Sequence, residues 1–132
     1  KRRKFGELVT ALVEAEGTND EMAEFVNPLA DLGQKVEKLT MEIGMKAFGN
    51  ADEAGAAAVD YLRVIGHLVL GYFWARMARI ALDRVDSGDP VYRSKLATAR
   101  FYFARLFPET ASLIRTARAG AGSLMNVEVE LF

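Results

Sequence analysis

Apolar residues recur every three or four positions along most of the chain, which is the spacing of amphipathic α-helices. The pattern first covers residues 5–13 and stops at Gly17. It resumes after the sequence TNDE, where Thr18 and Glu21 have the spacing of a capping box. We therefore predict one helix that ends at Gly17 and a second helix that begins near residue 19.

The second predicted helix has the most regular apolar seam. Its apolar positions alternate steps of three and four, as in helices that pack side by side; they are Met22, Phe25, Leu29, Leu32, Val36, Leu39 and Ile43. Pro28 lies within this run and lacks the N–H that a helix interior needs. We expect it to kink the helix, or to restart it with Asn27 as the cap.

A third helix is predicted from about residue 53 to residue 85. Phe48-Gly49 is a plausible stop for the second helix, and Asn50 or Asp52 can cap the third. The sequence DSGDP then predicts a sharp turn, with Asp89 as N-cap and Pro90 as first helical residue.

The fourth predicted helix begins at Pro90 and ends before Pro108. Its core face is predicted to hold Tyr92, Leu96, Ala99, Phe103 and Leu106, with Phe107 at the edge. PETASLIRTARAG then predicts a short last helix. LMNVEVELF alternates like a strand but has no partner strand, so we expect it to lie extended on the bundle or on another chain.

These elements predict an all-α fold, an antiparallel bundle of four main helices plus a short C-terminal helix and an extended tail. Residues 1–120 form the bundle and residues 121–132 the tail. The chain has 132 residues, is 51% hydrophobic and 27% charged, and has a net charge of −1. That length and composition are typical of one soluble globular domain.

The central segment DYLRVIGHLVLGYFWARMARIAL is long enough to raise the question of a membrane span. Its longest charge-free run covers residues 64–75, which is twelve residues, whereas a span needs about 20 predominantly apolar ones. We therefore predict that it is not a span but a helix enclosed by neighbouring helices. Gly66 and Gly71 each cost about 1 kcal/mol relative to Ala, so we expect a partner helix to approach closely there.

Charge is distributed unevenly along the chain. Residues 1–60 have a net charge of −5, and residues 61–118 have a net charge of +6. We predict an acidic helical hairpin lying against a basic one; a nucleic-acid or membrane surface is the alternative. The chain has no Cys, which excludes disulfides, thiolate metal sites and a Cys nucleophile and fits a reducing compartment. We expect a cytoplasmic protein.

Candidate chemistry is sparse. His67 is the only imidazole, and Val64 stands where a di-iron bundle has the Glu of its Glu-x-x-His motif. No P-loop, Gly-x-Gly-x-x-Gly motif or Gly-x-Ser-x-Gly elbow occurs. The basic segment YRSKLATARFYFAR suits an anionic partner in composition, but its aromatics share the predicted core face. We predict that this chain holds no catalytic, cofactor-binding or metal-ligating residue.

Two segments, AAVDYLRVIGHLVLGYFWARMA and DPVYRSKLATARFYFARLFPE, resemble the C-terminal helical region of bacterial flavin-dependent acyl-CoA dehydrogenases. The branch is the one that includes enzymes like 3-methylmercaptopropionyl-CoA dehydrogenase. The shared pattern covers about residues 54–120 and includes Gly66, Gly71, Asp89-Pro90 and the run Lys95-Leu96-Ala97-Thr98-Ala99-Arg100-Phe101. The final VEVELF has no counterpart in that pattern.

The resemblance implies a parent enzyme that oxidises an acyl-CoA thioester to its 2,3-enoyl form, with a Glu as base and FAD as hydride acceptor. Those groups belong to upstream domains, so FAD is implied for the parent and no cofactor for this chain. The expected function is an accessory and assembly domain, inactive alone, within a homo-oligomer. Its expected partners are the parent's other domains, without nucleic acid or membrane. Arg63, Lys95 and Arg100 are expected either in internal ion pairs or against those domains.

Two other functions remain open from the residues alone. The first is an independent helical binding module for a protein or anionic partner, and the second is an active stand-alone enzyme. Flavin retained by the purified chain would favour the enzyme.

Overall fold

The computed structural model describes residues 2–132, with side chains from Lys4 onward. Its α-helices are α1 Arg2–Glu16, α2 Ala23–Gly49, α3 Ala51–Arg84, α4 Pro90–Phe101, α5 Glu109–Arg118 and α6 Gly122–Met125. Single 3₁₀ turns occur at Asp20–Met22 and Val129–Leu131, and a π-helical turn, Tyr102–Leu106, continues α4. The described residues form no strand. The predicted all-α bundle is confirmed.

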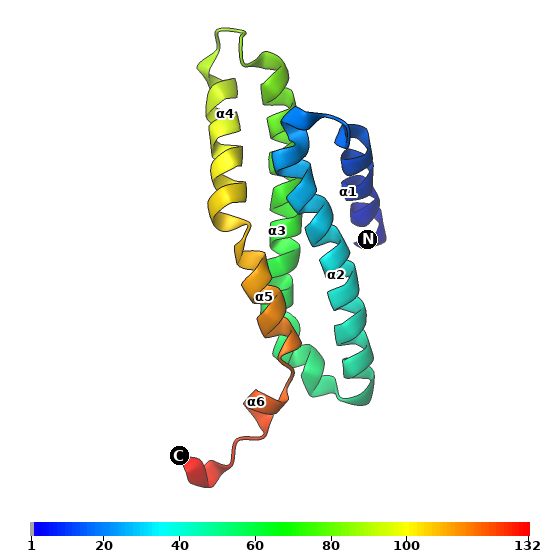
Figure 1. Cartoon of the computed structure of the whole chain (residues 1–132). Helices are drawn as coiled ribbons and strands as arrows, with labels where there is room; N and C mark the ends of the chain where they lie inside the picture. The colour runs from blue at the N-terminus through cyan, green and yellow to red at the C-terminus, as the bar shows by residue number, and fades with distance from the viewer. Residues whose placement is uncertain (1) are drawn as a thin grey trace.

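α3 is the central helix of the bundle. It forms a long antiparallel hairpin with α2, and α4 and α5 run back along it from the opposite end (Figure 1). α1 packs on α2 and reaches α3 through an edge-to-face contact of Phe5 with Tyr72, at 5.3 Å between ring centroids. α3 therefore has neighbours on several sides.

The apolar seam of α2 supplies most of the largest fully buried side chains, as its spacing predicts. Phe25, Leu29 and Leu39 are completely buried, and Ile43 packs partly buried against the same cluster. α3 contributes Val64 and Ala75 to the same core. Burial of side chains this size contributes about 1.5–3 kcal/mol each relative to exposure, so this seam holds the hairpin together.

Two of the predicted helix starts are confirmed by their caps. The side chain of Asn50 accepts a hydrogen bond from the Asp52 amide at 3.0 Å, and Asp89 accepts one from the Val91 amide at 3.0 Å. The predicted cap at Thr18 is wrong. Asn19 is the cap and accepts from the Glu21 amide at 3.1 Å, because a 3₁₀ turn precedes α2 and shortens the cap spacing.

The predicted restart of the second helix at Pro28 does not occur. α2 runs unbroken from residue 23 to residue 49, and Pro28 is its sixth residue. At that position the proline removes a single backbone hydrogen bond. The completely buried Phe25 and Leu29 flank the proline, so tertiary packing holds the chain helical on both sides of it.

The π-helical turn changes which residues of the fourth helix are buried. The Phe107 amide donates to the Tyr102 carbonyl at 2.9 Å, a bond across five residues instead of four. The wider turn rotates the following residues, so Tyr102 and Phe107 are buried whereas Leu106 is 46% exposed. The predicted core position of Leu106 is therefore wrong, and the burial of Tyr102 was not predicted.

The two glycines of α3 behave differently from one another. A Cβ at Gly71 would lie 2.9 Å from Phe107 Cε2 and 3.3 Å from Leu29 Cδ1, which confirms close approach there. At Gly66 a Cβ would have nothing within 4 Å. The expectation of close packing at Gly66 is wrong within this chain, because that side of α3 faces outward.

Ion pairs join the acidic half of the chain to the basic half, as the charge distribution predicts. Arg79 contacts Glu16 of α1 at 3.0 Å, Arg100 contacts Glu24 at 3.0 Å, and Arg118 contacts Glu42 at 2.7 Å. All three pairs lie near the surface, where such pairs add little stability. The three pairs therefore favour this arrangement of the helices but contribute little to the free energy of unfolding.

The tail after α5 is hydrogen-bonded to α3 at its start and then extends away from the bundle. The Ala121 amide donates to Glu53 of α3 at 3.1 Å, and Gly120 has a left-handed backbone with φ +82°. The residues from 122 onward are exposed, and Figure 1 shows them extending away from the helices. The tail contains two short helical turns, so it is not extended throughout.

The first prediction concerns the aromatic face of the bundle. Phe103 is 9% exposed and contacts Phe25 at 5.6 Å between ring centroids, so Phe103→Ala should lower the free energy of unfolding by about 3–5 kcal/mol. Phe101→Ala is the matched control because Phe101 is 58% exposed. Urea unfolding measures both, and equal losses in the two variants would contradict the assignment of Phe103 to the core.

The second prediction compares the glycines of α3. At dilutions where the chain is monomeric, Gly66→Ala should raise the free energy of unfolding by up to about 1 kcal/mol, because alanine favours helix and the site is open within one chain. Gly71→Ala should lower it, because overpacking against Phe107 costs about 1–3 kcal/mol and exceeds that gain. Thermal unfolding of both variants checks the opposite signs. A stabilised Gly71→Ala protein would rule out tight contact there.

Candidate functional site

A polar cluster joins α3, the π-helical turn and α5. His67 Nδ1 lies 2.8 Å from the Tyr102 hydroxyl, and His67 Nε2 lies 3.1 Å from a carboxylate oxygen of Glu109. The other carboxylate oxygen of Glu109 pairs with Arg63. The Tyr102 hydroxyl also lies 3.2 Å from the backbone carbonyl oxygen of His67. His67 is thus a partly buried imidazole that is hydrogen-bonded to neighbouring helices.

Burial controls the electrostatics of this cluster. Removal of Tyr102 from water, with a smaller contribution from the nearby Glu109 carboxylate, raises the pKa of Tyr102 to about 12. The phenol is therefore neutral at physiological pH. Glu109 lies in the first turn of α5, where a negative charge interacts favourably with the helix dipole.

The inner part of the cluster is largely enclosed by the bundle. His67 has hydrogen-bonding partners at both ring nitrogens, and Tyr102 is 4% exposed, so a substrate has little access to them. Within residues 4–132, whose side chains the structure describes, no buried polar side-chain atom lacks a hydrogen-bond partner. The same residues contain no group of three His, Asp or Glu placed to hold a metal ion.

An apolar stripe along the outer side of α3 is left uncovered by the rest of the chain. We call it the α3 stripe and define it as Val59, Leu62, Gly66, Leu70, Phe73, Met77 and Ile80. Its exposed fractions range from 49% at Phe73 to 71% at Val59, apart from the half-buried Gly66 and Met77. Apolar helix faces of this length are normally covered. The enclosure predicted for this helix is thus incomplete within the chain.

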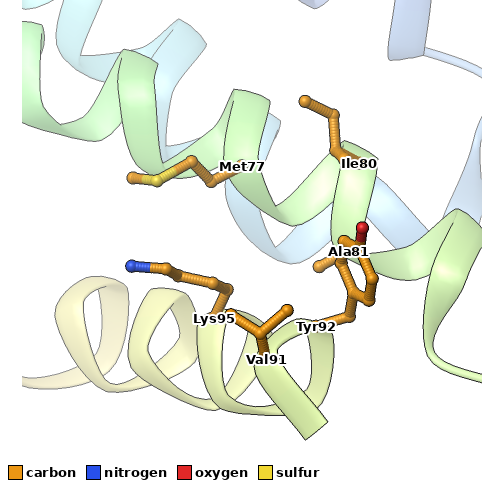
Figure 2. Close-up of a pocket in the computed structure, with 6 residues that line it drawn as sticks. All are labelled: Met77, Ile80, Ala81, Val91, Tyr92 and Lys95. Carbon is orange, nitrogen blue, oxygen red and sulfur yellow. The ribbon is translucent and has the colours of Figure 1, made fainter. Parts of the chain in front are cut away.

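Two of the grooves on the described residues are open to solvent. One, of about 200 Å³, lies between α3 and α4 and continues the α3 stripe; Met77, Ile80, Val91, Tyr92 and Lys95 surround it (Figure 2). The other, of about 410 Å³, is lined by Met41, Gly44, Met45 and Phe48, all from one helix. Ligand sites are concave clefts that bury most of the ligand, and a single helix face does not provide one.

By length and composition alone α3 could also cross a membrane. Its most apolar 18-residue window has a mean hydropathy of 1.2, and 28% of that window is buried. Core helices of soluble proteins meet the same criteria. Since α2, α4 and α5 all contact α3, we interpret it as the centre of the bundle with one side left uncovered.

Comparison with known protein families identifies the chain. Residues 5–128 match the model of the family described as acetyl-CoA dehydrogenase C-terminal like. The chain belongs to this family. The match covers α1 to α6, so it includes both the polar cluster and the α3 stripe. A search of curated proteins found none that matches.

Membership makes this domain part of a larger acyl-CoA dehydrogenase. The basic residues that the resemblance singled out have internal contacts: Arg63 pairs with Glu109, Arg100 pairs with Glu24, and Lys95 Nζ lies 6.0 Å from the centroid of the Trp74 ring. Tyr102 and Glu109 complete the polar cluster and were not predicted from the sequence. Glu109 directly follows Pro108, which was the available signal for a residue at a helix start.

The third prediction concerns the ionisation of Tyr102. Because the fold raises its pKa above the ordinary value of 10 to about 12, its stabilising effect is complete below pH 10 and is lost as the pH rises to 12. Ultraviolet titration should show a phenol that ionises near pH 12. Tyr102→Phe should remove that step, and its persistence would contradict the assignment.

Proposed function

We propose that this domain is the non-catalytic assembly domain of an FAD-dependent acyl-CoA dehydrogenase, in the branch that includes 3-methylmercaptopropionyl-CoA dehydrogenase. The parent enzyme would convert an acyl-CoA thioester to its 2,3-enoyl form in the cytoplasm as a homo-oligomer. The observation that carries this proposal is the α3 stripe, with Val59 and Leu62 about 70% exposed. Such a surface suits coverage by protein in the assembled enzyme.

The described residues do not fit a flavin. An isoalloxazine ring needs a cleft that buries most of its surface, whereas the grooves beside Met77 and beside Met45 are shallow and apolar. The buried polar side-chain atoms are also satisfied within this part of the chain. We therefore assign FAD, the catalytic base and the acyl-CoA site to the parent's other domains.

The polar cluster also fits a structural role for this domain, with the chemistry in the parent's other domains. In the parent, His67, Tyr102 and Glu109 would hold α5 against α3, so that the face of the bundle keeps its shape. The Glu109 carboxylate contacts Arg63 through one oxygen and His67 through the other, as expected of a link between helices.

The fourth prediction tests whether His67 takes part in the reaction. In the full-length parent, His67→Gln should lower the melting temperature but leave kcat within about threefold of the wild type. A general acid or base would cost about 10²–10⁴-fold in rate. Glu109→Gln is the matched variant, and kcat losses of that size in both variants would contradict a structural role.

The independent binding module remains the alternative, and the α3 stripe would serve it as well. The reading frame upstream of Lys1 distinguishes the two. A dehydrogenase core encoded there supports the assembly domain, and its absence supports the independent module. Flavin or turnover retained by the purified 132-residue chain would contradict both.

A further inference from the structure

The α3 stripe has the spacing of a helix-packing seam. Its seven members follow one another at steps of 3, 4, 4, 3, 4 and 3 residues, which is the pattern of helices that pack nearly parallel or antiparallel along their length. The occupant that such a seam fits is therefore another helix. We propose that this helix is α3 of a second copy of the chain, packed antiparallel about a twofold axis. This inference rests on the proposed assembly function and names the partner.

The shape of the stripe is self-complementary about its middle. Gly66 is open, since a Cβ there would meet nothing within 4 Å, and Leu70 one turn further on is 51% exposed. A twofold axis halfway between these two residues places Leu70 of each copy over Gly66 of the other. Leu70 then fills the space that the absent side chain leaves.

The same axis aligns opposite charges at the ends of the stripe. Asp52 and Arg84 are both exposed, and each lies sixteen residues, about 24 Å, from the axis along the helix. At about 100° per residue they also lie on the side of α3 that carries the stripe. An antiparallel pair therefore puts Asp52 of each copy beside Arg84 of the other. A parallel pair would bring like charges together.

The structure holds Arg84 at the end of the stripe. Its guanidinium lies 5.6 Å from the centroid of the Tyr92 ring, and its Nη1 donates to the Tyr92 hydroxyl at 3.1 Å. Tyr92 also lines the groove of Figure 2 beside Met77. The axis places the partner's Val59 opposite Met77, so an apolar side chain from the second copy covers this groove.

Charge exchange tests the antiparallel register directly. Sedimentation equilibrium of the 132-residue chain, with folding checked by circular dichroism, should show a dimer. Asp52→Arg should weaken its dimerisation about fivefold or more, because each interface loses two favourable pairs and gains two repulsive ones. Asp52→Arg combined with Arg84→Asp should restore the dimer to within about twofold. Equal weakening in the single and double variants would overturn the register.

A second pair of variants tests the stripe itself. Leu70→Glu should reduce dimerisation by more than about tenfold, because it places two carboxylates at the axis. Phe48→Glu is the matched control, since Phe48 is 97% exposed but lies on α2, and its dimer should be unchanged. Equal dimerisation of the two variants would overturn the proposal.

Cross-linking distinguishes this inference from the proposed function. The chain has no native Cys, so a mixture of Asp52→Cys and Arg84→Cys proteins should give a mixed cross-linked dimer with a short bismaleimide. Asp52→Cys alone should give none. A chain that is monomeric, or that binds phosphatidylcholine vesicles instead, overturns the self-pairing. The assembly function would still stand if the full-length parent buries the stripe against its own domains.

Discussion

The structure depends on the way that α3 is packed. A long helix with apolar residues on nearly every side must place each of them against a neighbour, and α2, α4 and α5 cover only part of its circumference. At Gly71 the packing is so close that Phe107 and Leu29 occupy the space of a side chain. On the opposite side, a Cβ at Gly66 would have no neighbour within 4 Å among the described residues. The helix that packs into the core on one side therefore leaves its other side uncovered.

The polar cluster follows from that arrangement. The π-helical turn after α4 places Tyr102 and Phe107 inward together, beside His67 of α3. Pro108 then ends the turn, and α5 begins with Glu109 within reach of both His67 and Arg63. The result is a hydrogen-bonded network, buried at Tyr102 and partly exposed at Glu109 and Arg63, which joins α5 to α3. Its chemistry favours a structural role inside a larger enzyme.

Local patterns predicted the elements well and the long-range pairings poorly. The seam from Met22 to Ile43 and the caps at Asn50 and Asp89 depend on residues near one another in sequence, so their spacing was informative. The π-helical turn depends on how Tyr102 and Phe107 pack against α3, and a regular helical projection therefore placed Leu106 wrongly. The different surroundings of Gly66 and Gly71 depend on neighbours distant in sequence. The bond between His67 and Glu109 spans 42 residues, and no local pattern predicts it.

The central claim is that this domain works through a covered surface of α3 and not through reacting groups. Hydroxyl-radical footprinting of the assembled full-length enzyme tests it most directly, with oxidation compared at Leu62 and Phe73 of the α3 stripe and at Phe48 of α2. Leu62 and Phe73 should be oxidised less in the assembled enzyme than in the isolated chain at high dilution. Phe48 serves as the reference residue within the bundle. Oxidation of Leu62 and Phe73 that is as strong in the assembled enzyme as in the diluted chain would contradict it.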